Sequence, residues 1–230
     1  AVEVTKADTT SQSAIITITV TNVFEPISHG GFTYQTVQSP DTGKIWLDRN
    51  LGASQVCTSS TDSACYGNYY QWGRDDDGHE SSNSVTTSTL ADSIAPGTDT
   101  FIASAEDWML KDSDKNGALR MAAWVDGAAN DICPTGFRVP TKTEVYSDTI
   151  EAITNEVINS ATAFSSFLKL PLAGLRQGST GAMVGEGRYG ALWNNTASGD
   201  GASVVYFTGT RAAQRSPGRS QGYNVRCLKD

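Results

Sequence analysis

The sequence predicts an α+β protein in which strands come first, one main helix follows, and further strands close the chain. Apolar and polar residues alternate over several short segments, whereas one segment alone has the 3.6-residue apolar period of a helix. The composition agrees, because 22 glycines and only 18% charged residues suit a loop-rich, partly β domain better than a helical bundle. A chain of 230 residues is also long enough to bury one hydrophobic core.

The first element is a strand over residues 13–23, where isoleucine and valine alternate with threonine until Pro26 blocks its continuation. One strand cannot form a sheet alone, so we interpret it as the last strand of a preceding β-sandwich repeat. Residues 1–30 are then this strand and a linker. The composition changes after Gly30 and Gly31, and we expect a ligand-binding domain over residues 31–230.

Within that domain, residues 32–37 and 44–47 predict a hairpin, because the segment between them is rich in turn-forming residues. Residues 81–100 are rich in serine and threonine without periodicity and predict a long surface loop. Three further strands are expected at residues 168–175, 204–208 and 223–228, separated by glycine-rich loops.

The main helix is predicted over residues 141–159. Thr141 and Glu144 have the spacing of a capping box, in which each side chain accepts a hydrogen bond from the other residue's backbone N–H. The apolar residues that share one face of this helix are Tyr146, Ile150, Ile153 and Val157.

The four cysteines allow three pairings. Cys57 and Cys65 flank a short polar loop and predict a local bridge, which leaves Cys133 to pair with Cys227. In the loop-entropy model the two bridges stabilise the fold by ~2.6 and ~4.7 kcal/mol, respectively. The alternative is four free thiols in a reducing compartment. A zinc site is not expected, because the chain has two histidines and no Cys-x-x-Cys pair.

The charge of −8 and pI of about 4.7 argue against nucleic-acid binding, which needs a basic surface, and favour divalent cations as partners. No run approaches 18 apolar residues, so we expect no membrane insertion.

One acidic cluster, at residues 112–117, has oxygen-bearing side chains at alternate positions followed by glycine, as in the first half of a calcium-binding loop. Ala123 stands where such a loop ends in a bidentate glutamate, so other acidic residues would have to complete the site. The expected calcium ligands here are Asp107, Asp112, Asp114, Asn116 and Asp126. The alternative is a solvated acidic turn.

A second acidic cluster contains Asp75, Asp76, Asp77 and Glu80. Adjacent carboxylates repel one another unless they are solvated, paired or bound to a metal. We expect Ca²⁺ here as well, with pairing to Arg74 as the alternative.

Signatures of catalysis are missing: the chain has no Gly-x-Ser-x-Gly, no His-Glu-x-x-His and no P-loop. Neither histidine lies in a sequence context typical of a catalytic residue, and we expect no enzyme activity. A binding surface is easier to argue, because glycine, arginine and aromatic residues gather without regular periodicity after residue 174. The predicted ligand-binding residues are Arg176, Gln177, Arg188, Tyr189, Trp193 and Arg211. The alternative places Trp193 and Tyr189 in the core and the arginines in solvent, and it is favoured for Trp193.

Several ordered segments carry a resemblance to a known family. They are WLDRNLGA at 46–53, YGNYYQWGRDDDGHE at 66–80, CPTGFRVPTKTE at 133–144, FLKLPLAGLR at 167–176 and the terminal VRCLKD. Together they resemble the FISUMP, or major paralogous, domain, over residues 31–230. The family is related to C-type-lectin-like folds, and this version is similar to the calcium-dependent peptide-binding domains of bacterial RTX adhesins.

The resemblance implies a C-type-lectin-like fold of loop-rich antiparallel sheets, a Cys133–Cys227 bridge and a ligand site built from irregular loops. It also implies an extracellular module at the bacterial cell surface that uses Ca²⁺ to bind a short peptide or a protein C-terminus on a host or neighbouring cell, as in biofilms.

Three alternatives remain beside this interpretation. The strongest is a calcium-dependent lectin for glycans, although the Glu-Pro-Asn and Gln-Pro-Asp tripeptides of such lectins are missing. An enzyme resembling the formylglycine-generating relatives of the fold would need a free cysteine. A purely structural spacer would bind no ligand.

Overall fold

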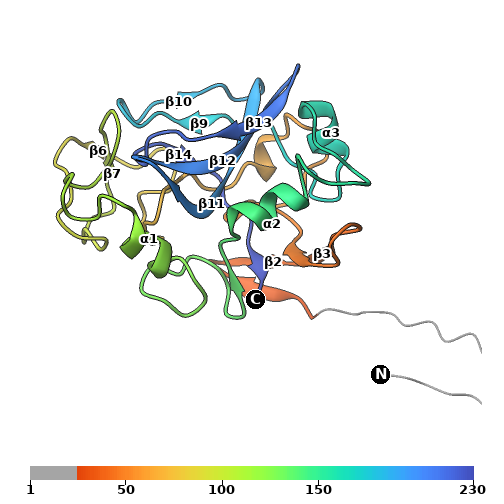
Figure 1. The fold of residues 1–230 in the computed structure, drawn as a ribbon, viewed down its shortest axis with the longest axis horizontal. Helices are drawn as coiled ribbons and strands as arrows, with labels where there is room; N and C mark the ends of the chain where they lie inside the picture. The colour runs from red at the N-terminus through yellow and green to blue at the C-terminus, as the bar shows by residue number, and fades with distance from the viewer. Residues whose placement is uncertain (1–24) are drawn as a thin grey trace, which may run out of the picture.

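The computed structural model describes residues 25–230 as an α+β fold rich in antiparallel sheet, with three short α-helices (Figure 1). This confirms the predicted class. The strand predicted over residues 13–23 lies outside the described residues.

The longest strands form one antiparallel sheet across the middle of the molecule (Figure 1), in the order β11 (Tyr189–Ser198), β12 (Gly201–Thr208) and β13 (Ala212–Arg215). A second sheet has the order β3 (Thr36–Gln38), β4 (Ile45–Leu47), β15 (Leu228–Lys229), β8 (Phe137–Arg138). A third has the order β10 (Met183–Val184), β9 (Leu175–Arg176), β14 (Gly222–Tyr223), β5 (Tyr70–Gln71).

Two strand pairs and the helices complete the described part. The antiparallel pair is β1 (Ile27–His29) with β2 (Phe32–Tyr34), and the parallel pair is β6 (Thr86–Thr87) with β7 (Phe101–Ile102). The helices are the 3-10 helix η1 (Ser63–Cys65), α1 (Ala118–Ala123), α2 (Lys142–Ser147) and α3 (Ser160–Ser165).

The hairpin expected around the turn at residues 39–43 is confirmed, since β3 pairs with β4 and Val37 lies opposite Trp46. The Ser39 hydroxyl stabilises the turn by accepting hydrogen bonds from the backbone N–H groups of Asp41 and Thr42. Residues 27–29, which the sequence analysis assigned to the linker, form β1 and pair with β2. The turn between them needs Gly30 and Gly31, whose φ angles are +55° and +79°.

The single helix predicted over residues 141–159 is wrong, because α2 ends at Ser147 and α3 starts only at Ser160. The capping box of Thr141 and Glu144 is confirmed. The helix ends where buried Asp148 turns toward the β3–β4 hairpin and accepts hydrogen bonds from Ser39 Oγ and from Trp46 Nε1, the latter at 2.8 Å. After Asp148 the chain leaves the helix, so the apolar spacing of the later residues does not form a helical face, and Ile153 is 93% exposed.

The predicted strand at residues 204–208 is confirmed within β12. Residues 168–174 form no strand, and residues 223–228 are strand only at their two ends. The ten-residue strand β11 was missed, since Gly190, Asn194 and Asn195 are poor strand formers. Gly190 nevertheless pairs with Phe207 of β12, while Asn194 and Asn195 lie at an irregularity in the register between Trp193 and Ala197, where both are buried.

Both faces of the β11–β12 pair pack against apolar side chains. One face meets a cluster rich in aromatic rings that includes Trp72, Trp124, Trp193 and Tyr223. The other meets a cluster from α2, α3 and the 168–172 segment. Across the described residues, no helix has the length and apolar composition that spanning a membrane requires.

Both predicted disulfides are confirmed. Cys57 pairs with Cys65, and Cys133 pairs with Cys227 within the aromatic cluster. Two disulfides are compatible with an extracellular protein.

The two bridges should differ in their contribution to stability, because they close loops of very different length, with sequence separations of 8 and 94. We expect the double variant C133A/C227A to lose ~4.7 kcal/mol of unfolding free energy and C57A/C65A ~2.6 kcal/mol, measured by urea denaturation. Equal losses would show that the entropy of loop closure does not determine how much each bridge contributes to the unfolding free energy.

Candidate functional site

The candidate site is a pocket of about 110 Å³ beside the β1–β2 hairpin. We call it the acidic pocket, because Asp76 and Glu80 contribute to its lining. The remaining lining residues are His29, Gly30, Phe32, Tyr34, Leu51, Gly52, Asn68 and Tyr70. Two carboxylates thus face the same small space as several aromatic rings.

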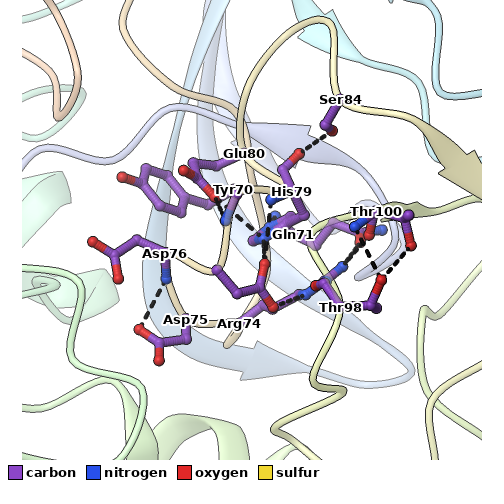
Figure 2. Close-up of polar contacts among 12 residues, drawn as sticks. Tyr70, Gln71, Arg74, Asp75, Asp76, His79, Glu80, Ser84, Thr98 and Thr100 are labelled. Carbon is purple, nitrogen blue, oxygen red and sulfur yellow. Dashed lines mark hydrogen bonds and ion pairs between the residues drawn. The ribbon is translucent and has the colours of Figure 1, made fainter.

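The loop that carries both carboxylates follows β5 and is held by Arg74, whose side chain is fully buried. Its guanidinium donates to Asp77 Oδ2 at 2.9 Å, and also to the backbone carbonyls of Thr98 and Thr100. Figure 2 shows Arg74 directed toward Thr98 and Thr100, with Asp75 and Asp76 on the other side of the loop. Arg74 therefore neutralises Asp77, whereas Asp75 and Asp76 are left without a cation.

His79 is the second anchor of the loop and is completely buried. Its Nε2 accepts a hydrogen bond from the Gln71 backbone N–H at 3.0 Å, so Nε2 carries no proton. Its Nδ1 lies 2.7 Å from Asp77 Oδ1 and donates to it. Burial lowers the pKa of His79 to about 4, against the opposing effect of Asp77, so the imidazole is neutral at physiological pH.

Asp77, His79 and Glu80 bring possible metal ligands within 4.8 Å of one another. Both nitrogens of His79 already have partners, and both oxygens of Asp77 accept hydrogen bonds. Asp77 and His79 therefore act as structural supports of the loop in this conformation, and Glu80 is the member with an oxygen to spare.

Asp75, Asp76 and Glu80 are the carboxylates of this loop that no guanidinium neutralises. Within residues 25–230, no lysine or arginine forms an ion pair with them, and the basic group in contact is the neutral His79, whose Nδ1 lies 3.5 Å from Glu80 Oε2. Partial burial and the neighbouring Asp75 raise the pKa of Asp76 to about 6, although its side chain still meets solvent. Burial also raises the pKa of Glu80.

This donor set fits a hard cation. Calcium binds carboxylate, amide and water oxygens, and Asp76 and Glu80 line one pocket, where the charge of Glu80 contributes to the raised pKa of Asp76. The raised pKa values record the repulsion and desolvation that a divalent cation would relieve.

The cluster at residues 112–117 is arranged differently. Asp114 accepts hydrogen bonds from the backbone N–H groups of Leu119 and Arg120, and its Oδ2 lies 2.9 Å from Arg120 Nε. Asp107 binds Arg120 and Arg219 through its two oxygens. Two buried guanidiniums thus already neutralise these carboxylates.

The other expected ligands of that site are not brought into the same network. Asp126 accepts from the Gly136 backbone N–H, and Asp112 and Asn116 are exposed. The signal for this outcome was present in the sequence as Arg120 and Arg219, but only the fold shows that they meet Asp107 and Asp114.

The expected ligand-binding residues fall into two groups. Arg176 is buried, with its guanidinium 4.2 Å from the Phe101 ring centroid and bonded to the carbonyls of His79, Ser81 and Gly181. Trp193 is buried in the core, where its Nε1 donates to the Tyr70 carbonyl. Neither side chain reaches the surface, and for Trp193 the core interpretation describes its position.

The second group lies at the surface. Gln177 is half-buried and accepts a hydrogen bond from Thr180 Oγ1 through its side-chain oxygen, while Arg188 and Arg211 are exposed. The Tyr189 hydroxyl donates to the Val184 carbonyl, and its ring lies 5.3 Å from that of Tyr206. None of these residues lines the acidic pocket.

Sequence reasoning missed the pocket residues His29, Phe32 and Asn68. Asn68 lies inside the 66–80 segment that carries part of the resemblance, but no residue pattern around it indicated a role in binding. His29 and Phe32 join the pocket only through the β1–β2 hairpin.

Compared with known proteins, the chain matches no family model, no curated protein and no solved structure. The assignment of this site therefore depends on its geometry.

The buried neutral His79 predicts a pH dependence of stability. Its folded-state pKa of about 4 is below the unfolded value of 6.5, so the unfolded chain binds the proton first and stability is lost as pH falls between these values. This loss should reach about 3 kcal/mol in urea denaturation at stepped pH, and His79→Gln should remove it. The opposing titration of Asp76 is removed by making both measurements in an Asp76→Asn background. Parallel curves for the two proteins would contradict a buried neutral imidazole.

Proposed function

We propose that this chain is a calcium-dependent ligand-binding module of a bacterial surface adhesin that recognises a short peptide or a protein C-terminus. The observation that supports it is the pair of uncompensated carboxylates, Asp76 and Glu80, at an aromatic-lined pocket, with Asp75 next to Asp76 in the chain.

The pocket is anionic without a cation, so a peptide carboxylate would be repelled from it. Calcium held by Asp76 and Glu80, with Asp75 beside them, would neutralise the loop and supply an open coordination position for an anionic oxygen. The chain's own residues would orient the ligand: Phe32 and Tyr34 offer apolar contact, and the Asn68 amide, 3.4 Å from the Tyr70 hydroxyl, offers polar contact. Arg74 and His79 keep the loop in place, which lowers the ordering cost of binding.

The aromatic lining also favours a second candidate, a calcium-dependent lectin. A sugar ring could stack on Phe32, which is half-buried, while its hydroxyls coordinate the cation. The enzyme alternative is less well supported, because all four cysteines form disulfides and the thiol of formylglycine-generating relatives is missing.

Calcium should raise the unfolding free energy of the wild-type chain by ~2.7 kcal/mol at a concentration 100-fold above Kd. The variant D76N/E80Q should lose this increase, and in chelator it should be more stable than the wild type, since two repelling charges are gone. D92N, at an exposed aspartate, is the matched control and D112N/D114N tests the other acidic cluster. An unchanged midpoint with calcium in the wild type would refute the metal site.

A peptide and glycan array probed in calcium, and again in chelator, separates the two ligand classes. We expect calcium-dependent binding to peptides with a free C-terminal carboxylate and weaker binding to the same peptides with an amidated end. Binding to glycans alone would assign the pocket to the lectin alternative, and a lack of saturable binding would leave only a structural spacer.

A further inference from the structure

The sheet of β11, β12 and β13 ends in an unpaired edge. In the described part of the chain, β13 pairs only with β12, and residues 214–216 are exposed. The Thr208 backbone N–H donates to the Arg211 carbonyl at 2.8 Å, which makes Thr208 and Arg211 a hydrogen-bonded pair. Such pairs alternate along an antiparallel ladder, so Ala213 and Arg215 also direct their N–H and C=O groups toward β12. Ala212 and Gln214 direct theirs away from it.

These outward groups have no hydrogen-bond partner within residues 25–230. A strand edge of this kind presents two N–H donors and two C=O acceptors in the spacing that another extended chain needs. The edge is short, and its neighbouring side chains decide what can pair with it.

Those side chains are cationic and aromatic. Arg215 places its guanidinium 5.6 Å from the ring centroid of Tyr206, so both lie on one face of the sheet, and the alternation of the strand places Arg211 on that face too. Neither arginine forms an ion pair within the described residues, in a chain of net charge −8. Tyr189, whose ring is tilted against that of Tyr206, extends the same face.

The charges also disfavour a second copy of this chain as the occupant. If β13 paired antiparallel with a second copy through Ala212 and Gln214, Arg211 of one chain would lie opposite Arg215 of the other, and like charges in that position repel. A segment with acidic side chains at alternate positions would replace both repulsions by ion pairs.

We propose that the β13 edge binds an extended acidic peptide segment by β-strand addition, with Arg211 and Arg215 pairing with its carboxylates. This surface is separate from the acidic pocket and needs no calcium. It binds an internal segment of the partner chain and not the end of that chain.

The test uses the full chain in chelator, with a fluorescent peptide of alternating threonine and glutamate, acetylated and amidated so that it has no free terminus. We expect saturable anisotropy and slowed amide hydrogen exchange at Ala212 and Gln214. R211E/R215E should weaken binding by about tenfold or more, because two attractions become repulsions. Q214P removes an outward N–H without removing a β12–β13 hydrogen bond and should abolish binding, whereas Q214A should retain it.

Controls separate this proposal from its rivals. A peptide with lysine in place of glutamate should not bind, and D76N/E80Q, which disables the pocket, should bind the acidic peptide normally. The absence of saturable binding, binding unaffected by Q214P in a folded variant, or preference for an acidic oligosaccharide over the peptide would each overturn the proposal. In the first case the arginines would serve only to keep the edge from self-association.

Discussion

Buried arginines hold this fold together. Its strands are short and much of the chain is irregular, so many backbone carbonyls inside the molecule have no partner in a sheet or helix. Arg226 donates to the carbonyls of Leu47 and Leu168, and Arg219 to those of Gly199, Gly201 and Asp114. A guanidinium suits this task because it offers five donors in a fixed plane and remains charged even where burial lowers its pKa, which for Arg226 is about 9.

The same interactions divide the acidic residues into two kinds. Asp77, Asp107 and Asp114 lie against buried guanidiniums and are part of the structure. Asp76 and Glu80 lie a few residues from Arg74 but are not neutralised by it, and their pKa values are raised. This difference, rather than the number of carboxylates in a segment, distinguishes the candidate calcium site from an acidic turn.

The molecule thus presents two surfaces of opposite character. The acidic pocket is a concave site made by a loop and the β1–β2 hairpin, whereas the β13 edge is an exposed strand edge, cationic and bordered by tyrosines. If both proposals hold, one ligand could bind through its terminus at the pocket and through an extended segment at the β13 edge, which would raise the effective concentration of each ligand part for the other.

The amino-acid sequence was enough to predict the α+β class, the hairpin around Ser39, the capping box of Thr141 and both disulfides. These features depend on local spacing or on a small number of possible pairings. It failed where a distant partner overrides the local pattern, as when Asp148 ends α2 by bonding Trp46, or when β12 draws the glycine- and asparagine-containing β11 into a sheet.

Which charged and aromatic residues are available for binding became clear only from the three-dimensional fold. Arg176 and Trp193 are residue types common in ligand sites, but both lie in the interior, where their N–H groups donate to buried backbone carbonyls. Asp76 stays at the surface because Arg74 is already bonded to Asp77. Contacts between segments far apart in the chain determine burial and ion pairing, and the spacing of residues along the sequence does not predict these contacts.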